Sequence, residues 1–145
     1  MSVGRICSRV VATASGSETV RTAAARMAEH EVGTLVVVGT SHPRQAIGIL
    51  TDRDLAVRCI AGRWDPDATV ISAVMTSPVQ SVDEHVPIAD AVAMMARSGT
   101  RRLVVTGEDN RVVGLLSLDD VLGVAVEEAG AIGQLLEQQK PRIPA

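Results

Sequence analysis

Two pairs of oxygen-bearing side chains have the types and the spacing that could do chemistry. Thr51 stands three residues before Asp54, and Ser117 stands three residues before Asp120. At the start of a helix, such a hydroxyl can donate to a phosphate, and the carboxylate can accept hydrogen bonds from the cis-diol of a ribose. The same spacing is that of a helix capping box, which needs no ligand. From these residues alone, both interpretations stay open.

The two pairs occupy equivalent positions in an internal repeat. Residues 48–55, Gly-Ile-Leu-Thr-Asp-Arg-Asp-Leu, correspond to residues 114–121, Gly-Leu-Leu-Ser-Leu-Asp-Asp-Val, at an offset of 66 residues. Two more matches support the repeat: 18–24 with 84–90 at the same offset, and 35–37 with 103–105 at an offset of 68. The sequence therefore predicts two copies of one structural unit.

Hydrophobic spacing predicts the same elements in each copy. Apolar residues recur at i, i+3, i+4 and i+7 from Val20 and again from Ile88, which indicates one buried helix face. Pro87 suits the first turn of the second helix, and Gly33 and Gly99 fall where the two helices should end. Short apolar segments precede these helices at 10–11 and 79–82, and the predicted strands after them are 34–38, 46–50, 102–106 and 111–116.

A further helix is predicted after Thr51 and after Ser117, and an apolar stripe continues the last one over 124–139. Three short strands with helices on one side cannot bury both faces of their sheet, but two such units packed sheet to sheet can. The predicted fold class is therefore α+β, with two pseudo-symmetric β-α-β-β-α repeats packed as one domain. The tail 140–145 is expected to fray.

This arrangement resembles the CBS-domain family, named for cystathionine β-synthase. Val74-Met75-Thr76-Ser77-Pro78-Val79 is similar to the family's opening strand, and residues 48–55 and 114–121 are similar to its closing signature, Gly-apolar-apolar-Ser/Thr-x-x-Asp. The resemblance spans about residues 5–127 and includes small bacterial stand-alone members. It divides the chain into a first motif with the start of a linker, 1–66, and a second motif with a helical extension, 67–145.

The resemblance implies two clefts that take AMP, ADP, ATP or S-adenosylmethionine, with no other cofactor required. Ribose and phosphate would meet the Ser/Thr and Asp of the closing signatures, and the opening strands would meet the base. The implied binding residues are Thr51, Asp54, Ser117, Asp120, Thr76, Val79 and Val11, with Arg53 and Arg102 within reach of phosphates. The two arginines are equally well explained as solvated surface residues.

We expect the cleft of Ser117 and Asp120 to bind more tightly, because we pair it with the opening strand at 75–78, which follows the family pattern. The first opening strand, residues 6–10, lacks the Met-Thr and the Pro. The expected function is a regulatory sensor of an adenosine-type ligand. The alternatives are a structural dimerisation module with degenerate clefts and, least favoured, an enzyme. The regulated partner cannot be named from the sequence.

Composition argues against several other functions. A net charge of −3 and a single aromatic residue, Trp64, disfavour a nucleic-acid partner. His30, His42 and His85 lack metal-ligand spacing, and Asp119-Asp120 has no nucleophile or base set beside it. No apolar run reaches 18 residues, so we expect no membrane partner and a cytoplasmic protein.

The remaining predictions concern the state of the two cysteines and the helical surfaces through which the protein could dimerise. Cys7 and Cys59 are interpreted as reduced thiols rather than a disulfide. The alanine-rich helices around 23–28 and 89–96 are expected to leave apolar surface uncovered and to form a homodimer. The C-terminal stripe is interpreted as a packing or dimer helix, because its polar face carries Glu127, Glu128 and Glu137 rather than the lysines of a membrane-surface helix.

Overall fold

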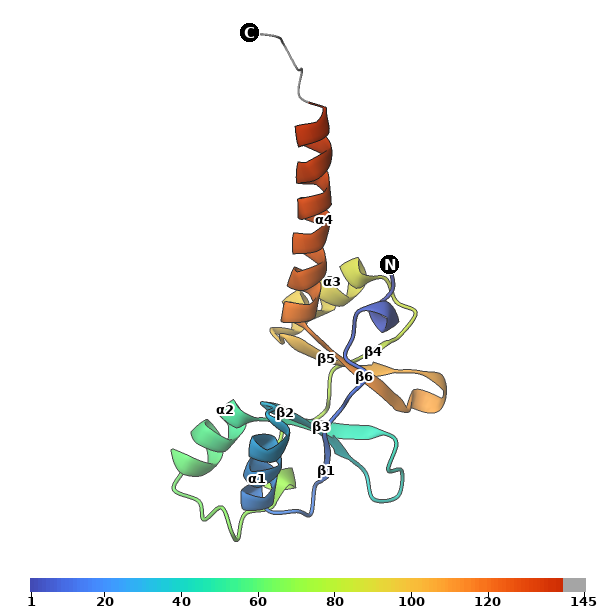
Figure 1. Ribbon diagram of the computed structural model, residues 1–145. Helices are drawn as coiled ribbons and strands as arrows, with labels where there is room; N and C mark the ends of the chain where they lie inside the picture. The colour runs from blue at the N-terminus through green and yellow to red at the C-terminus, as the bar shows by residue number, and fades with distance from the viewer. Residues whose placement is uncertain (140–145) are drawn as a thin grey trace.

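The chain folds into two similar units that stand one above the other, with a long helix rising from the second (Figure 1). The computed structural model describes residues 1–139. The first unit contains β1 (Thr13–Ser15), α1 (Val20–His30), β2 (Thr34–Val38), β3 (Ala46–Thr51) and α2 (Asp52–Asp54), which continues as a π-helical turn over Leu55–Ile60. The second contains β4 (Ser81–Asp83), α3 (Ile88–Ser98), β5 (Arg102–Thr106), β6 (Val112–Ser117) and α4 (Leu118–Gln138). Short 3-10 turns lie at Val3–Arg5, Ile71–Ala73 and Glu108–Asn110.

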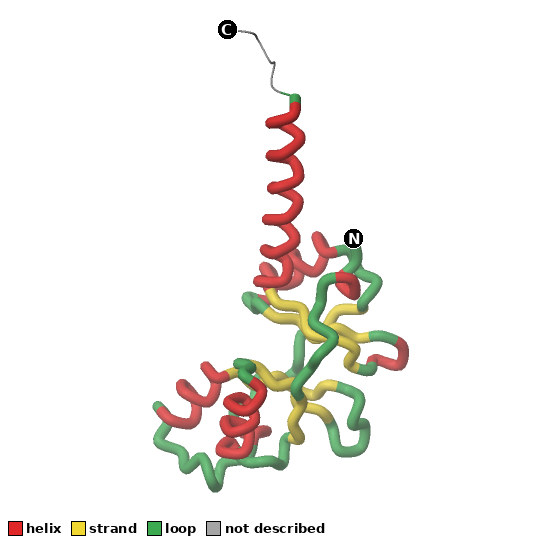
Figure 2. The backbone as a smooth tube through the Cα atoms, in the orientation of Figure 1, coloured by secondary structure: helices red, strands yellow, loops and turns green. Residues whose placement is uncertain are grey.

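Both sheets have three strands and the same topology (Figure 2). The first strand pairs parallel to the second, and the second pairs antiparallel to the third. Thr34 lies opposite Thr51 in one sheet, as Arg102 lies opposite Ser117 in the other. The register shifts after Val37 and at the equivalent place after Val105. The predicted fold class and the four predicted strands after the first helices are therefore confirmed.

Three element boundaries differ from the prediction. Helix α1 ends at His30 because Glu31 adopts a left-handed conformation with φ of 53°, so the chain has already turned before Gly33. Gly99, with φ of 66°, caps α3 as predicted. Pro87 is the extended N-cap of α3 rather than a residue of its first turn. The segment 10–11 is not a strand, and the first sheet begins at β1.

Each unit buries side chains from a segment that belongs to the other half of the repeat. The fully buried Ile71 and Val74 pack with the core of α1, β2 and β3. Val3 and Cys7 pack in the same way with the core of α3, β5 and β6. The packing thus crosses the predicted boundary between residues 66 and 67 in both directions, and the assignment of two domains at that boundary stays a prediction.

Glycines in the closing signatures permit this exchange. Ile49 and Thr76 exchange backbone hydrogen bonds of 3.0 and 2.9 Å, and Ser8 and Leu115 exchange an equivalent pair of 3.0 and 2.9 Å. A Cβ on Gly48 would lie 2.6 Å from the Met75 sulfur, and a Cβ on Gly114 would lie 2.6 Å from the Cys7 sulfur. Glycine is therefore required where the opening segment of one half runs against the last strand of the other.

The central strands are buried on both faces. Leu35 and Val37 belong to the helix-side core, whereas Val36 between them is also fully buried, on the opposite face. Val104 has the same place in the second sheet. The face of each sheet turned away from its helices is therefore buried as well, which is consistent with sheet-to-sheet packing.

The structure also bears on the predictions for the two cysteines and for the C-terminal helix. Cys7 and Cys59 are both free and buried, and they lie in different cores, so no disulfide joins them. The predicted C-terminal helix is present as α4. The fraying predicted for 140–145 concerns residues outside those that the structure describes.

Replacing Ile71 with Ala tests the exchanged core. This fully buried side chain comes from the second half but packs in the first core, so its loss should lower the free energy of unfolding by about 2–5 kcal/mol. The exposed neighbour Val70→Ala is the matched control and should change it by less than about 1 kcal/mol. Urea unfolding is followed by Trp64 fluorescence, which reports on the first half, and by circular dichroism, which reports on both. Transitions that separate in the wild type would contradict the interlocked core.

Acid stability tests the ion pair between Arg26 on α1 and Glu18 in the turn between β1 and α1. Arg26 donates to both carboxylate oxygens of Glu18 at 2.6 and 2.8 Å, and the Ser15 N–H donates at 2.8 Å. The Arg26 hydrogen bonds lower the pKa of Glu18. The folded pKa therefore lies below the unfolded value, so the stabilisation is present above about pH 4.3 and is lost as pH falls through the folded pKa.

Glu18→Gln should therefore lower the free energy of unfolding near neutral pH by on the order of 1 kcal/mol and flatten its fall in acid. Melting temperatures measured from pH 7 to pH 3 check this, with the exposed Glu108→Gln as control. Parallel acid curves for Glu18→Gln and wild type would contradict the assignment.

Candidate functional site

A cavity of about 470 Å³ opens between the two units and is lined by both. It contains six of the nine predicted binding residues: Thr51, Arg53, Asp54, Thr76, Val79 and Arg102. The other lining residues are Ile49, Asp52, Pro78, Gln80, Ser98, Gly99, Thr100 and Arg101. The structure therefore brings the first closing signature together with the second opening segment.

Backbone hydrogen bonds hold one wall of this cavity in place. Thr76 is bonded to Ile49 on β3, and the Ser77 hydroxyl donates to the Ile47 carbonyl at 2.8 Å. Farther on, the Val104 N–H donates to the Gln80 carbonyl at 3.0 Å, which joins the same segment to the second sheet. Segment 76–80 therefore spans both units and closes the space between them.

The predicted pairing of opening strands with closing signatures is wrong. Thr76 and Val79 face Thr51 and Asp54, because the opening segment crosses to the other unit before its own sheet begins. Val11 lines a different cavity of about 430 Å³ with Arg26 and His30. The family-like opening strand thus serves the cleft of Asp54, and the argument for tighter binding beside Asp120 fails.

Both hydroxyl–carboxylate pairs form capping boxes. The Thr51 N–H donates to Asp54 Oδ2 at 2.9 Å, and the Asp54 N–H donates to Thr51 Oγ1 at 3.2 Å. Ser117 and Asp120 make the same two bonds at 2.8 and 3.2 Å, and the Ser117 hydroxyl also donates to Asp120 Oδ2 at 2.7 Å. The capping interpretation is therefore confirmed for both pairs, and the contact with ribose stays a prediction.

The start of α2 offers few backbone donors to an anion. The Asp52 N–H donates to the Gly33 carbonyl at 3.0 Å, and the Arg53 N–H donates to Asp52 Oδ1 at 2.8 Å. With the Asp54 N–H bonded to Thr51, the first three amides of the helix all have partners. The sequence argument for a phosphate at this helix terminus therefore loses its donors. Arginine side chains must supply them instead.

Positive charge gathers at this cavity. Arg53, Arg101 and Arg102 line it, against the carboxylates of Asp52 and Asp54. Within residues 1–139, the side chains of Arg53 and Arg102 make no ion pair, and Arg101 makes only a long one of 3.9 Å to Asp119. Two guanidinium groups are thus available to a ligand.

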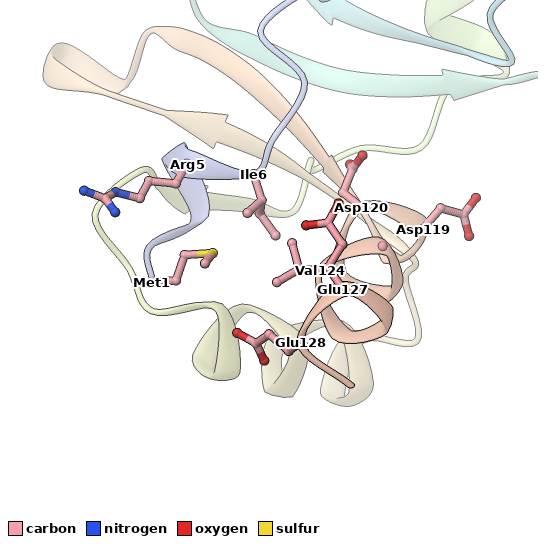
Figure 3. Close-up of a pocket in the computed structure, with 9 residues that line it drawn as sticks. Met1, Arg5, Ile6, Asp119, Asp120, Val124, Glu127 and Glu128 are labelled. Carbon is pink, nitrogen blue, oxygen red and sulfur yellow. The ribbon is translucent and has the colours of Figure 1, made fainter. Parts of the chain in front are cut away.

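The repeat-related place lacks these three arginines. At offsets of 66 and 68 residues, the equivalents of Arg53, Arg101 and Arg102 are Asp119, Gly33 and Thr34. Figure 3 shows the cavity of about 670 Å³ beside Asp120, between the N-terminal segment and the start of α4. Its charged lining residues are Asp119, Asp120, Glu127, Glu128 and Arg5. This cavity shares only Asp119 and Asp120 with the repeat-related place, because residues 10–12, the equivalents of segment 78–80, line the cavity of about 430 Å³ instead.

Sequence reasoning missed the end of α3 and the loop that follows it. Ser98, Gly99, Thr100 and Arg101 face the first closing signature across the cavity, although they lie far from it in the sequence. The adjacency of Arg101 to Arg102 was the one available signal. Among residues 1–139, no group of three His, Cys, Asp or Glu side chains could hold a metal ion. None of the helices in that range is long and apolar enough to cross a membrane.

Solved structures share this architecture. The CBS domain protein PAE2072 from Pyrobaculum aerophilum, complexed with AMP, is similar with a TM-score of 0.75 and 26% identity, over 83% of this chain and 89% of that chain. The CBS domain pair of protein MJ0100, in complex with 5-methylthioadenosine and S-adenosyl-L-methionine, is similar in fold with a TM-score of 0.78 and 23% identity, over 88% of this chain and 98% of that chain. A hexameric CBS-CP12 protein from bloom-forming cyanobacteria is similar with a TM-score of 0.75 and 25% identity, over 84% and 69% of the two chains.

Relatives are also found by sequence. The CBS domain-containing protein YhcV of Bacillus subtilis is 36% identical over 111 residues, which cover 77% of this chain and 76% of YhcV. The uncharacterized protein MK0525 of Methanopyrus kandleri is 33% identical over 124 residues, which cover 86% of this chain but only 62% of the relative's length.

The two halves of the repeat also match the family description itself. The sequence profile of the CBS domain matches residues 3–59 and again residues 71–127, which together make up most of the chain. Each matched range begins with the opening segment and ends in the helix after the closing signature, as the repeat predicts. The chain therefore belongs to the CBS-domain family, with two CBS motifs.

Proposed function

We propose that this protein is a regulatory module that binds an adenosine-type ligand in the cavity between the first closing signature and segment 76–80. The observation that carries the proposal is the convergence of six predicted binding residues and a third arginine, Arg101, on one cavity. Its volume of about 470 Å³ lies within the range of roughly 300–1,000 Å³ usual for small-molecule sites. The Pyrobaculum relative complexed with AMP supports this class of ligand.

The proposed pose follows from the lining side chains. The base lies against Ile49, Pro78 and Val79, where backbone groups of segment 76–80 read its edge. The ribose lies at Asp54, whose Oδ2 closes the capping box while Oδ1 lies 3.7 Å from the Arg58 guanidinium. The phosphate meets Arg53 and Arg102, since charge-assisted bonds to guanidinium groups are the strongest donors on offer.

Charge also ranks the candidate ligands. Three arginines against two aspartates favour AMP, ADP and ATP over S-adenosylmethionine, whose sulfonium is positive. The repeat-related place has Asp119, Gly33 and Thr34 where the three arginines stand, which disfavours a phosphate there. We therefore propose one phosphate-binding cleft per chain, at Asp54, with no cofactor required for folding.

A regulatory effect of the ligand follows from the fact that residues of both units line the cavity. The cavity is lined by both units, so a bound ligand bridges them and favours the arrangement in which its two walls are correctly spaced. We propose that this shift in population is what a partner protein detects. The partner's identity is not indicated by the described residues.

A structural dimerisation module remains the second candidate. The observation that favours it is that both capping boxes are complete without any ligand. A catalytic role is not proposed, because no histidine, cysteine or lysine among residues 1–139 lines the cavity and the Thr51 hydroxyl is held by its cap. The two buried free thiols suit a reducing compartment, and a cytoplasmic location stays a prediction.

The homodimer predicted through α1 and α3 also stays a proposal. The exposed apolar residues of these helices are small, namely Ala24, Ala25, Ala28, Ala89 and Ala96. The large exposed apolar side chains lie elsewhere, mainly on α4 and on the segment 57–64. The expected uncovered patch on α1 and α3 is therefore narrower than the sequence suggested.

Asp54→Ala tests the ligand site, with Asp120→Ala as its matched control. Both changes break an equivalent capping box, so each should lower the free energy of unfolding by about 0.5–2 kcal/mol. Only Asp54→Ala should also weaken the ligand, by about 10- to 100-fold. Ligand at about 100 times its dissociation constant should stabilise the wild type by about 2.7 kcal/mol.

Melting temperatures with and without AMP, ADP, ATP and S-adenosylmethionine measure both effects. The wild type and Asp120→Ala should respond to nucleotide, and Asp54→Ala should respond far less. An absence of any nucleotide shift in the wild type would favour the structural module. A response lost in Asp120→Ala but kept in Asp54→Ala would place the ligand in the other cleft.

Arg102→Gln tests the phosphate contact. The change should weaken ATP and ADP by about 10-fold while leaving adenosine nearly unchanged, because only the phosphates meet the guanidinium. It should also reduce the salt dependence of ATP binding. Titration calorimetry at two salt concentrations gives both quantities, with the exposed Arg97→Gln on α3 as control. Equal losses for ATP and adenosine would contradict a phosphate contact.

A further inference from the structure

The two hairpin loops lie on the edge of the molecule opposite α2 (Figure 1). The loop between β2 and β3 has seven residues, 39–45, whereas the loop between β5 and β6 has five, 107–111. Because of this difference, the arginines of the two loops are not repeat equivalents: at an offset of 66, Arg111 corresponds to Gln45 and not to Arg44. This edge is therefore a place where the two halves differ.

Hydrogen bonds join the two loops across the units. The Val112 N–H donates to the Arg44 carbonyl at 2.7 Å, and Gln45 Nε2 donates to the Asp109 carbonyl at 3.1 Å. Within the first loop, the Gln45 N–H donates to the His42 carbonyl at 3.0 Å. These bonds use backbone atoms and the Gln45 amide, so they fix the loops without engaging the side chains of the arginines.

A cavity of about 300 Å³ opens between the joined loops. Arg44 and Arg111 line it, together with the hydroxyl of Ser41 and the imidazole of His42. Among residues 1–139, none of these four donor side chains has a hydrogen-bond or ion-pair partner. Four unpaired donors from two units therefore surround one small space.

Charge indicates what this space can hold. Two guanidinium groups in one small cavity repel each other. Of the described residues that line the cavity, only Asp109 is acidic, and it forms no ion pair with either arginine. The cavity thus keeps an excess of positive charge in a protein whose net charge is −3. An anion between the loops would relieve the repulsion and accept hydrogen bonds from both arginines.

The number of donors favours a phosphate group over a carboxylate. Guanidinium groups form charge-assisted, bidentate bonds with both kinds of anion. A phosphate group offers three acceptor oxygens and a carboxylate offers two, so a carboxylate would leave more of the four donors unpaired. The volume of about 300 Å³ lies at the lower end of the usual range for small-molecule sites. The phosphate of a small ester, or free phosphate, therefore fits better than a whole nucleotide.

We propose that the cavity between the hairpin loops binds a phosphate group, with Arg44 of the first unit and Arg111 of the second unit on the same ligand. Free phosphate and the phosphoryl group of a small ester present the same oxygens to these side chains. A bound phosphate bridges the two units at the edge opposite α2. The site is separate from the two clefts of the repeat and independent of the nucleotide proposal, because no residue of either loop lines the cavity of Asp54.

Titration of the full-length protein with inorganic phosphate, followed by nuclear magnetic resonance, tests the site. At constant ionic strength, saturable shifts are expected for the amide signals of residues 41–45 and 109–112. Arg44→Gln and Arg111→Gln should each weaken phosphate by about 10-fold, because each removes charge-assisted bonds. Arg97→Gln on α3 is the matched control, since Arg97 is also exposed and unpaired among residues 1–139.

The fold should survive these changes, because the loops are joined through the Arg44 carbonyl and not through its side chain. Amide signals outside the loops should therefore keep their wild-type positions in the ligand-free variants. Arg102→Gln alters the cavity of Asp54 and should leave the phosphate shifts of the loops unchanged.

Glycerol 3-phosphate and acetate identify the ligand class. Tighter binding of the ester than of inorganic phosphate would assign the site to the phosphoryl group of a metabolite, and the reverse order would assign it to free phosphate. Acetate binding as tightly as phosphate would overturn the choice of phosphate. Loop shifts that are absent, or that persist equally in Arg44→Gln and Arg111→Gln, would overturn the site, and shifts confined to the cavity of Asp54 would place the anion there instead.

Discussion

Two short backbone bridges determine how the rest of the protein is built. Ile49 with Thr76 and Ser8 with Leu115 each join the last strand of one half to the opening segment of the other. The bridges need glycine at positions 48 and 114, because any side chain there would collide with a sulfur atom of the opening segment. Once these segments are in place, Ile71 and Val74 complete one core, and Val3 and Cys7 complete the other. The same crossing builds one wall of the candidate ligand cavity.

The backbone repeats, but the charges do not. Both closing signatures adopt the same capping box, and both sheets have the same register. The cavity at Asp54 carries three arginines, whereas the repeat-equivalent positions are Asp119, Gly33 and Thr34. A fold with two equivalent places for a ligand has thereby acquired one place suited to an anionic group. Each capping box satisfies backbone groups at the start of its own helix, α2 or α4, without a ligand. The two clefts can therefore differ in charge without destabilising the fold.

Local patterns predicted the elements well, and contacts across the chain were harder to predict. The spacing of apolar residues located four strands and the helices, and Gly99 ended α3 where expected. Glu31 ended α1 early by adopting a left-handed backbone, which no residue preference indicated. Six of the nine residues predicted to bind a ligand line one cavity, yet Thr76 and Val79 were paired with Asp120 instead of Asp54. Offsets within a repeat show which residues are equivalent, but they do not show which half an opening segment packs against. Arg101 was missed for the same reason.

The most direct test of the central claim is a crystal structure of the protein grown with ADP. The account predicts electron density for the phosphates within hydrogen-bond distance of Arg53 or Arg102, with the ribose at Asp54 and the base against segment 76–80. Density for the nucleotide beside Ser117 and Asp120, or an opening segment packed on the last strand of its own half, would contradict it.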